Sequence, residues 1–179
     1  MLYIVEYTGP FGYLKPWTAV RDRETYSHQF LTPSVVEGMR QKLGVAAILR
    51  HRLSYDFLDT QQEVVHARAW KPGKPRNQGV ITRGILINPV LRLAFVTEAD
   101  AQQAARQHLC LCRNEDLVFP TEKIECVGAE EFDQGDGFEL RFEPEHPAAF
   151  PVGYNRYVNG QLMRGWLQVV GRPVRRAGR

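Results

Sequence analysis

The segment RDRETYSHQFLTPSVVEGMRQKL, residues 21–43, ends in the most complete helix signal of the chain. Thr32 is a typical N-cap, and Pro33 suits the first helical position because the N–H that proline lacks would have no partner there. The apolar stripe that follows consists of Val35, Val36, Met39 and Leu43. Gly44 is a typical helix end. We therefore expect one amphipathic helix over residues 33–43.

Strand-like segments lie on both sides of this helix. Residues 2–8 are rich in β-forming residues and precede it. Further strands are expected at residues 53–59, 63–70, 80–88, 90–96 and 124–128, and a second helix at 98–109. The order strand, helix, strand pair, helix, strand is that of the β-α-β-β-α-β ferredoxin-like arrangement. The sequence therefore predicts an α+β fold, with an RRM-like antiparallel sheet that has helices on one face.

The chain divides into three parts. Residues 1–132 form the expected ferredoxin-like domain. Residues 133–171 are expected to form a C-terminal β appendage, because strand-like runs flank Asn159 and Gly160, a pair typical of a tight hairpin turn. Residues 172–179, RPVRRAGR, are expected to form a basic, flexible tail.

Length and composition indicate one globular domain. With 179 residues, of which 44% are hydrophobic, the chain is able to bury a sizeable core. It has no apolar run of the roughly 20 residues that a membrane span needs, and its first residues do not resemble a signal peptide. We expect a cytoplasmic protein with no membrane association.

The net charge of +3 is unevenly distributed along the chain. Residues 1–97 carry +6 (13 basic and 7 acidic), residues 98–145 carry −9 (4 basic and 13 acidic), and residues 146–179 carry +6 (6 Arg and no acid). This distribution favours one polyanion-binding face and a second face turned elsewhere. A merely solvated surface is the alternative, and charge alone does not decide between the two.

The sequence lacks the motifs of metal, nucleotide and hydrolytic sites. Cys110, Cys112 and Cys126 are odd in number and lack zinc-ligand spacing, so we expect them to be small buried hydrophobic residues. The five histidines, at positions 28, 51, 66, 108 and 146, are scattered. No phosphate-binding glycine loop, HExxH or GxSxG occurs. We expect no metal and no cofactor.

Basic residues interleaved with aromatic residues favour RNA binding. Cations follow the phosphates of a single strand while aromatic rings stack on its unpaired bases, and the first turn of the predicted helix would add an anion site. The candidate RNA-binding residues are Phe11, Tyr13, Lys15, Trp17, Arg21, Arg23, Tyr26, Thr32, Ser34, Arg40, Lys71, Lys74 and Arg76. The alternative is that the charges of residues 21–24 pair with one another and the aromatic residues belong to the core.

A catalytic interpretation is also open. Metal-independent RNA cleavage needs a base for the 2′-hydroxyl, an acid for the leaving oxygen and a cation for the phosphate. Tyr26, His28 and Arg23 are chemically capable of these roles, which makes Tyr26 and His28 the candidate catalytic residues. Their spacing is common by chance, so RNA binding without catalysis is the preferred interpretation.

The first 45 residues also form a longer pattern. An N-terminal strand is followed by G-x-F, a proline, a charged R-x-R-E-x-Y loop and T-P-S-x-x-x-G at a helix start. The residues of this pattern are Gly9, Phe11, Pro16, Arg21, Arg23, Glu24, Tyr26, Thr32, Pro33, Ser34 and Gly38. In this pattern the chain resembles the Cas-five family of CRISPR-associated proteins, of the RAMP superfamily. The resemblance thins toward residue 132 and does not extend beyond it.

The resemblance implies a function and partners. It implies an RNA-binding subunit that caps the 5′ handle of the CRISPR RNA (crRNA) in a Cascade-like, type I or type IV effector complex for antiviral defence. The implied partners are the crRNA, the backbone and large subunits and, indirectly, the target nucleic acid. A thumb-like β-hairpin is also implied, for which residues 63–83 are the candidate.

One departure from the family bears on cleavage. In the subtype that also cuts the precursor RNA, a tyrosine follows the helix and a Lys-His pair assists. Here Gly44 stands at the helix end, and no Lys-His dipeptide occurs. We expect a subunit that is not an enzyme; the alternative is a metal-independent endoribonuclease that processes precursor crRNA.

Overall fold

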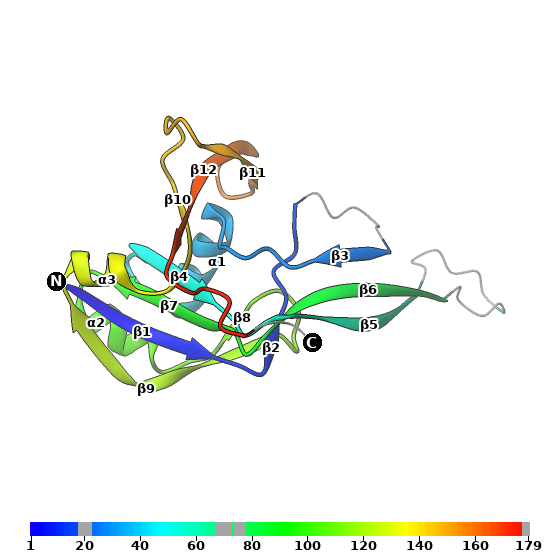
Figure 1. The fold of residues 1–179 in the computed structure, drawn as a ribbon, viewed down its shortest axis with the longest axis horizontal. Coiled ribbons are helices and arrows are strands. Elements are labelled where there is room, and N and C mark those ends of the chain that lie inside the picture. The colour runs from blue at the N-terminus through cyan, green and yellow to red at the C-terminus, as the bar shows by residue number, and fades with distance from the viewer. Residues whose placement is uncertain (18–22, 67–72, 74–77, 177–179) are drawn as a thin grey trace.

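The chain folds as an α+β protein built on a mostly antiparallel sheet with few helices (Figure 1). This computed structural model describes residues 1–17, 23–66, 73 and 78–176. The main sheet has eight strands in the order β11-β12-β10-β4-β7-β1-β9-β8. These strands are β1 (Leu2–Thr8), β4 (Arg50–Ser54), β7 (Val90–Phe95), β8 (Leu109–Cys110), β9 (Leu117–Val127), β10 (Gly137–Arg141), β11 (Phe150–Asn155) and β12 (Gln161–Val170).

The helix predicted from the sequence is confirmed as α1 (Pro33–Leu43). Gly44 ends it in the left-handed conformation, with φ of 69°, which glycine adopts without steric cost. Thr32 precedes it in extended geometry, but its hydroxyl makes no capping hydrogen bond. The second helix, α2 (Glu98–Ala104), is shorter than expected, and a third, α3 (Ala129–Gln134), was not predicted.

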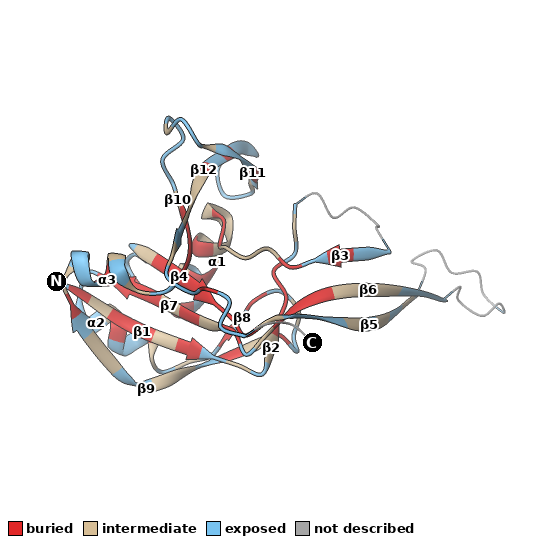
Figure 2. Cartoon of the chain, in the orientation of Figure 1, coloured by how far each residue is buried: buried red, intermediate tan, exposed pale blue. Residues whose placement is uncertain are grey.

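The core of the fold follows from the alternation of side chains along the strands. Val5 and Tyr7 of β1 point to the face that α1 and α2 cover, whereas Leu2 and Ile4 point to the other face. Phe132 of α3 packs on that second face. The sheet is therefore buried on both sides near β1 and β7, as the red segments of Figure 2 show.

A long hairpin extends from one end of the main sheet (Figure 1). It consists of β5 (Leu58–His66) and β6 (Gln78–Ile87), which are paired along their whole lengths. Two short strands, β2 (Phe11–Gly12) and β3 (Glu24–Tyr26), also pair with β6, and β3 does so in parallel. The candidate thumb at residues 63–83 lies within this hairpin, but its tip is outside the described residues.

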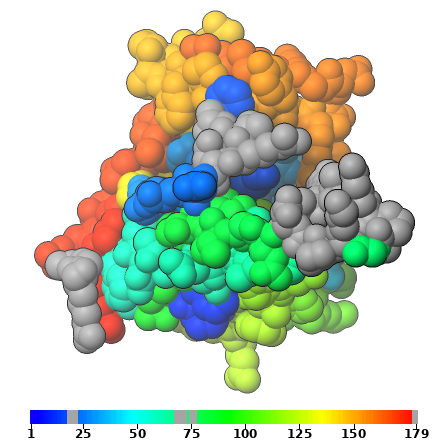
Figure 3. Space-filling model, turned by 90° about the vertical axis from the view of Figure 1, so that its right-hand side faces the viewer, coloured from blue at the N-terminus to red at the C-terminus, as the bar shows by residue number. Residues whose placement is uncertain are grey.

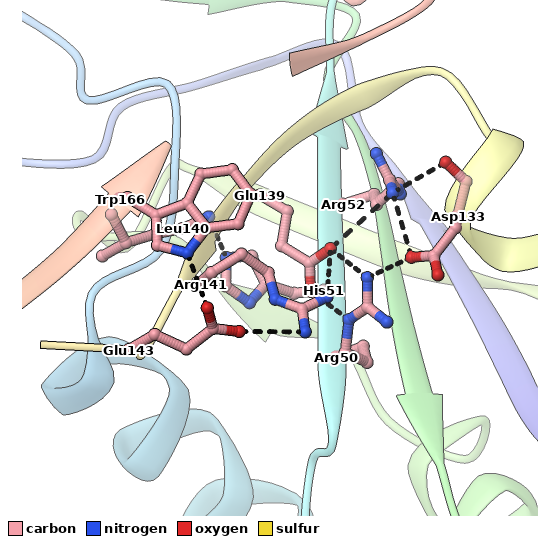
Figure 4. Close-up of polar contacts among 9 residues, drawn as sticks. All are labelled: Arg50, His51, Arg52, Asp133, Glu139, Leu140, Arg141, Glu143 and Trp166. Carbon is pink, nitrogen blue, oxygen red and sulfur yellow. Dashed lines mark hydrogen bonds and ion pairs between the residues drawn. The ribbon is translucent and has the colours of Figure 1, made fainter. Parts of the chain in front are cut away.

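The seam between β4 and β10 joins the C-terminal strands to the rest of the sheet. One backbone register pair, Phe138 with Leu53, links the two strands. A side chain extends the seam, because His51 of β4 accepts a hydrogen bond at Nε2 from the backbone N–H of Leu140, 3.3 Å away (Figure 4). The imidazole nitrogen thus takes the place of a backbone carbonyl.

A buried ion pair completes the seam. Arg50 of β4 donates from Nε and Nη2 to the two carboxylate oxygens of Glu139 on β10, at 2.5 and 2.7 Å, and from Nη2 to Asp133 of α3 at 2.6 Å. The Glu139 side chain is 2% exposed, and the neighbouring Arg52 is 1% exposed. Removing one partner of such a pair costs about 3–5 kcal/mol, because a charge is left buried. Arg50 and Arg52 are therefore structural and not part of a basic surface.

Residues 173–176 of the expected flexible tail (172–179) are bonded to the fold, and residues 177–179 lie outside the described residues. Backbone hydrogen bonds join residues 173–176 to Tyr55 and Asp56. The Arg175 guanidinium donates to Asp56 at 2.9 Å and to the carbonyl oxygen of Asn88, and Arg176 lies 3.3 Å from Asp56. Asp56 follows β4 and Asn88 follows β6, so this segment is bonded to both ends of the hairpin root.

We predict that acid weakens the seam through His51. Burial, and then the charges of Arg50, Arg52 and Arg141, lower the pKa of His51 to about 3, whereas the unfolded chain protonates near pH 6.5. The unfolded state therefore binds more protons below pH 6.5, and the free energy of unfolding falls by about 1–2 kcal/mol between pH 6.5 and 5.

Denaturant unfolding at several pH values measures this effect. His51→Gln should flatten the dependence in that window, whereas the exposed His108→Gln should leave it unchanged. Equal slopes in the wild type and His51→Gln would show that the seam does not depend on a neutral imidazole.

Candidate nucleic-acid interface

A cleft of about 530 Å³ lies where α1 meets the C-terminal hairpin. One wall comes from residues 14–17 and 28–34 and from one side of α1, from Val35 to Lys42, and the other from residues 152–157 with Met163. Residues 109–112 close one end. In Figure 3 the β11–β12 region lies in orange above the blue N-terminal segments.

The chemistry of the cleft is cationic and aromatic. Its lining, as far as the structure describes it, holds three cationic side chains and no carboxylate: Lys15, Lys42 and Arg156. Neither lysine has a carboxylate within 4.0 Å among the described residues. The aromatic members are Trp17, His28, Phe30, Tyr154 and Tyr157. Such a lining suits an anionic ligand with flat, partly apolar groups.

Three contacts hold the walls of the cleft together. The Ser34 hydroxyl, in the first turn of α1, donates to Oδ1 of Asn155 at 3.2 Å. The rings of Trp17 and Tyr154 meet edge to face with centroids 5.9 Å apart. Arg156 and Tyr157 also lie close to α1, because Gly38 has no side chain to keep them away.

Eleven of the thirteen predicted RNA-binding residues divide into three groups. Lys15, Trp17, Thr32 and Ser34 line the cleft together. Phe11, Arg23 and Tyr26 lie outside the cleft, on or beside the short strands β2 and β3. Arg21, Lys71, Lys74 and Arg76 fall outside the described residues.

One predicted RNA-binding residue, Tyr13, is buried, and another, Arg40, is already ion-paired. Tyr13 is 1% exposed; its hydroxyl donates to Thr25, and the guanidinium groups of Arg83 and Arg113 lie 5.4 Å from its ring centroid. Its ring is therefore closed off from a base. Arg40 donates to both oxygens of Glu37 and to a backbone carbonyl, so its charge is already paired on the helix surface.

The sequence did not single out the second wall of the cleft. Tyr154, Arg156 and Tyr157 come from the appendage, where the resemblance does not extend. They nevertheless form the same basic–aromatic pattern that singled out residues 11–26, directly before the turn at Asn159. Applied evenly along the chain, the same criterion would have found them.

The cysteines are also placed differently from the prediction. Cys110, Cys112 and Cys126 are all free and exposed, not buried. Cys110 and Cys112 line the end of the cleft. Across the described part of the chain, no three His, Cys, Asp or Glu side chains gather into a group that could hold a metal ion.

The candidate catalytic residues do not lie together in the cleft. His28 lines it, stacked on Phe30, and burial lowers its pKa. Tyr26 is outside the lining; its hydroxyl donates to Glu24 at 2.7 Å, and this bond raises the pKa of the phenol. A raised pKa opposes a role for Tyr26 as the base.

Comparison with solved structures places the fold. One chain, from a structure titled "CRISPR RNA-guided surveillance complex", matches with a TM-score of 0.59 over 95% of this chain and 89% of the other, at 12% identity. A second, titled "Crystal structure of Cas protein", matches with a TM-score of 0.50 over 99% of both chains, at 13% identity. The fold is shared. No family model and no curated protein matches the sequence.

Among the described helices, none has the length and apolar character required to cross a membrane.

We predict that Gly153→Ala damages the cleft. Gly153 has φ of 122°, which residues with a side chain rarely adopt, and an added Cβ would lie 3.1 Å from Cβ of Trp17. The strain should lower the free energy of unfolding by about 1–3 kcal/mol and displace the indole. Thermal unfolding measures the loss. Gly160→Ala, also at positive φ but with open space around it, separates the backbone strain from the contact with Trp17.

Proposed function

We propose that this chain is an RNA-binding subunit of a CRISPR effector complex and that its cleft binds the 5′ handle of the crRNA. The observation that carries the proposal is the lining of the cleft, in which three cations and five aromatic rings face one space without a carboxylate among the described residues. The fold shared with a chain of an RNA-guided surveillance complex supports the same function.

The order of the central strands supports the family that the sequence resembles. Along the chain the elements run β1-α1-β4-β7-α2-β9, and in the sheet the strands lie in the order β4-β7-β1-β9. Every neighbouring pair is antiparallel. We interpret this core as the ferredoxin-like domain of a Cas-five, RAMP-type protein that acts in the cytoplasm.

The hairpin β5–β6 gives the proposed complex its protein contacts. It is the insertion between the second and third core strands, and its outer part is exposed or half-buried (Figure 2). The proposal assigns it as the thumb that contacts a neighbouring backbone subunit. The large subunit and, indirectly, the target nucleic acid complete the proposed partners.

The first test removes the two cleft lysines. Lys15→Ala with Lys42→Ala should weaken binding of a labelled single-stranded handle RNA, because two phosphate contacts are lost. The slope of log affinity against log salt should shrink by about 1.4, since each contact to a single strand contributes about 0.7. Fluorescence anisotropy at several salt concentrations measures both quantities.

A matched double variant controls for net charge. Arg106→Ala with Lys123→Ala removes the same charge from exposed positions that do not line the cleft. It should bind RNA nearly as the wild type does. If both double variants weaken binding equally, the cleft is not the RNA site.

We further propose that the chain binds RNA without cutting it. The position of Tyr26 outside the cleft that His28 lines, together with the raised pKa of the Tyr26 phenol, supports this. Precursor repeat RNA incubated with the full chain in EDTA should remain intact on a denaturing gel. Cleavage that His28→Ala abolishes would instead establish the endoribonuclease alternative.

A further inference from the structure

Two large aromatic side chains that line the cleft leave much of their surface exposed to solvent. Trp17 is 44% exposed and Tyr154 is 61% exposed. Large rings are usually buried because their apolar area gains free energy on leaving water. Here each ring leaves a substantial part of its surface to solvent, so a ligand is able to cover it.

The two rings come from opposite walls and hold each other in place. Trp17 belongs to the N-terminal segment and Tyr154 to β11, and their planes meet at 85°. The close approach of Gly153 to the Trp17 side chain fixes the indole further. Because the rings are held before a ligand arrives, little conformational entropy is lost when a flat group stacks on them.

Each ring has a cation two residues away along the chain. Lys15 precedes Trp17, and Arg156 follows Tyr154. The Arg156 guanidinium lies 4.9 Å from the Tyr157 ring centroid and donates to its hydroxyl at 3.0 Å, and no described carboxylate pairs with it. Ring and cation repeat on both walls, as a base and its phosphate alternate in a single strand.

We infer that Trp17 and Tyr154 form a subsite for one unpaired RNA base, with Arg156 contacting the phosphate beside it. This inference rests on the proposed function. A base within a duplex has both faces stacked on its neighbours, so the subsite selects an unpaired nucleotide. Stacking on an aromatic side chain is tolerant of sequence, so position in the strand, more than base identity, determines which nucleotide binds.

The experiment combines an abasic scan with variants of the rings. Handle RNAs that lack one base each, at successive positions, are titrated against the full-length wild type, Trp17→Ala and Tyr154→Ala. In the wild type, loss of the base at one position, or at two neighbouring positions, should weaken binding about 5- to 150-fold, which corresponds to a stacking free energy of roughly 1–3 kcal/mol. Each variant should bind intact RNA more weakly and be insensitive to loss of that base.

Two controls separate stacking from damage to the fold. Phe119→Ala removes a ring that is 52% exposed on β9, outside the cleft lining, and should keep the sensitivity of the wild type. Trp17→Phe and Tyr154→Phe retain an aromatic face and should restore most of the lost affinity.

The outcomes distinguish the inference from the proposed function. If the wild type binds handle RNA but no abasic position matters, or if sensitivity persists in both alanine variants, the subsite is overturned while RNA binding stands. If the wild type does not bind single-stranded RNA even at low salt, the proposed function and the subsite both fall.

Discussion

A buried ion pair between Arg50 and Glu139 joins the two parts of the chain that together create the cleft. Backbone pairing across the β4–β10 seam amounts to one register pair, so side chains supply most of the specific connection. Desolvating both charges is expensive, and replacing such a pair with apolar residues is often neutral or stabilising elsewhere. Its value here lies in geometry, because a two-point contact fixes how β10 meets β4.

The position of one wall of the cleft depends on the β4–β10 seam, although the seam does not line the cleft. β10 pairs with β12, and β12 pairs with β11, whose end carries the aromatic wall. A small rotation at the seam would therefore move that wall away from α1. The contacts across the cleft, from Ser34 to Asn155 and from Trp17 to Tyr154, are weak individually. They add to the geometry that the ion pair fixes, so the proposed binding surface is structurally coupled to the core.

The sequence predicted what local interactions determine. The helix α1 has its stop and apolar stripe within twelve residues, and the turn at Asn159 and Gly160 connects β11 to β12 as expected. The sequence-based prediction failed where the structure depends on contacts between residues far apart in the chain. The arginines near the C-terminus suggested a solvated tail because their acceptor, Asp56, lies more than a hundred residues away. Only one wall of the cleft was predicted from the sequence. The other wall was missed because Tyr154 comes near Trp17 only when β10 pairs with β4.

The bond between Arg175 and Asp56 has a consequence for the order in which the molecule assembles. The two residues are separated by 119 positions, so during synthesis the carboxylate is made long before its guanidinium partner. Until residues 173–176 emerge from the ribosome, the root of the β5–β6 hairpin lacks the hydrogen bonds through which Arg175 links Asp56 to the carbonyl oxygen of Asn88. The contacts that fix the hairpin root are thus completed only after all the described strands, the last of which ends at Val170, have been translated.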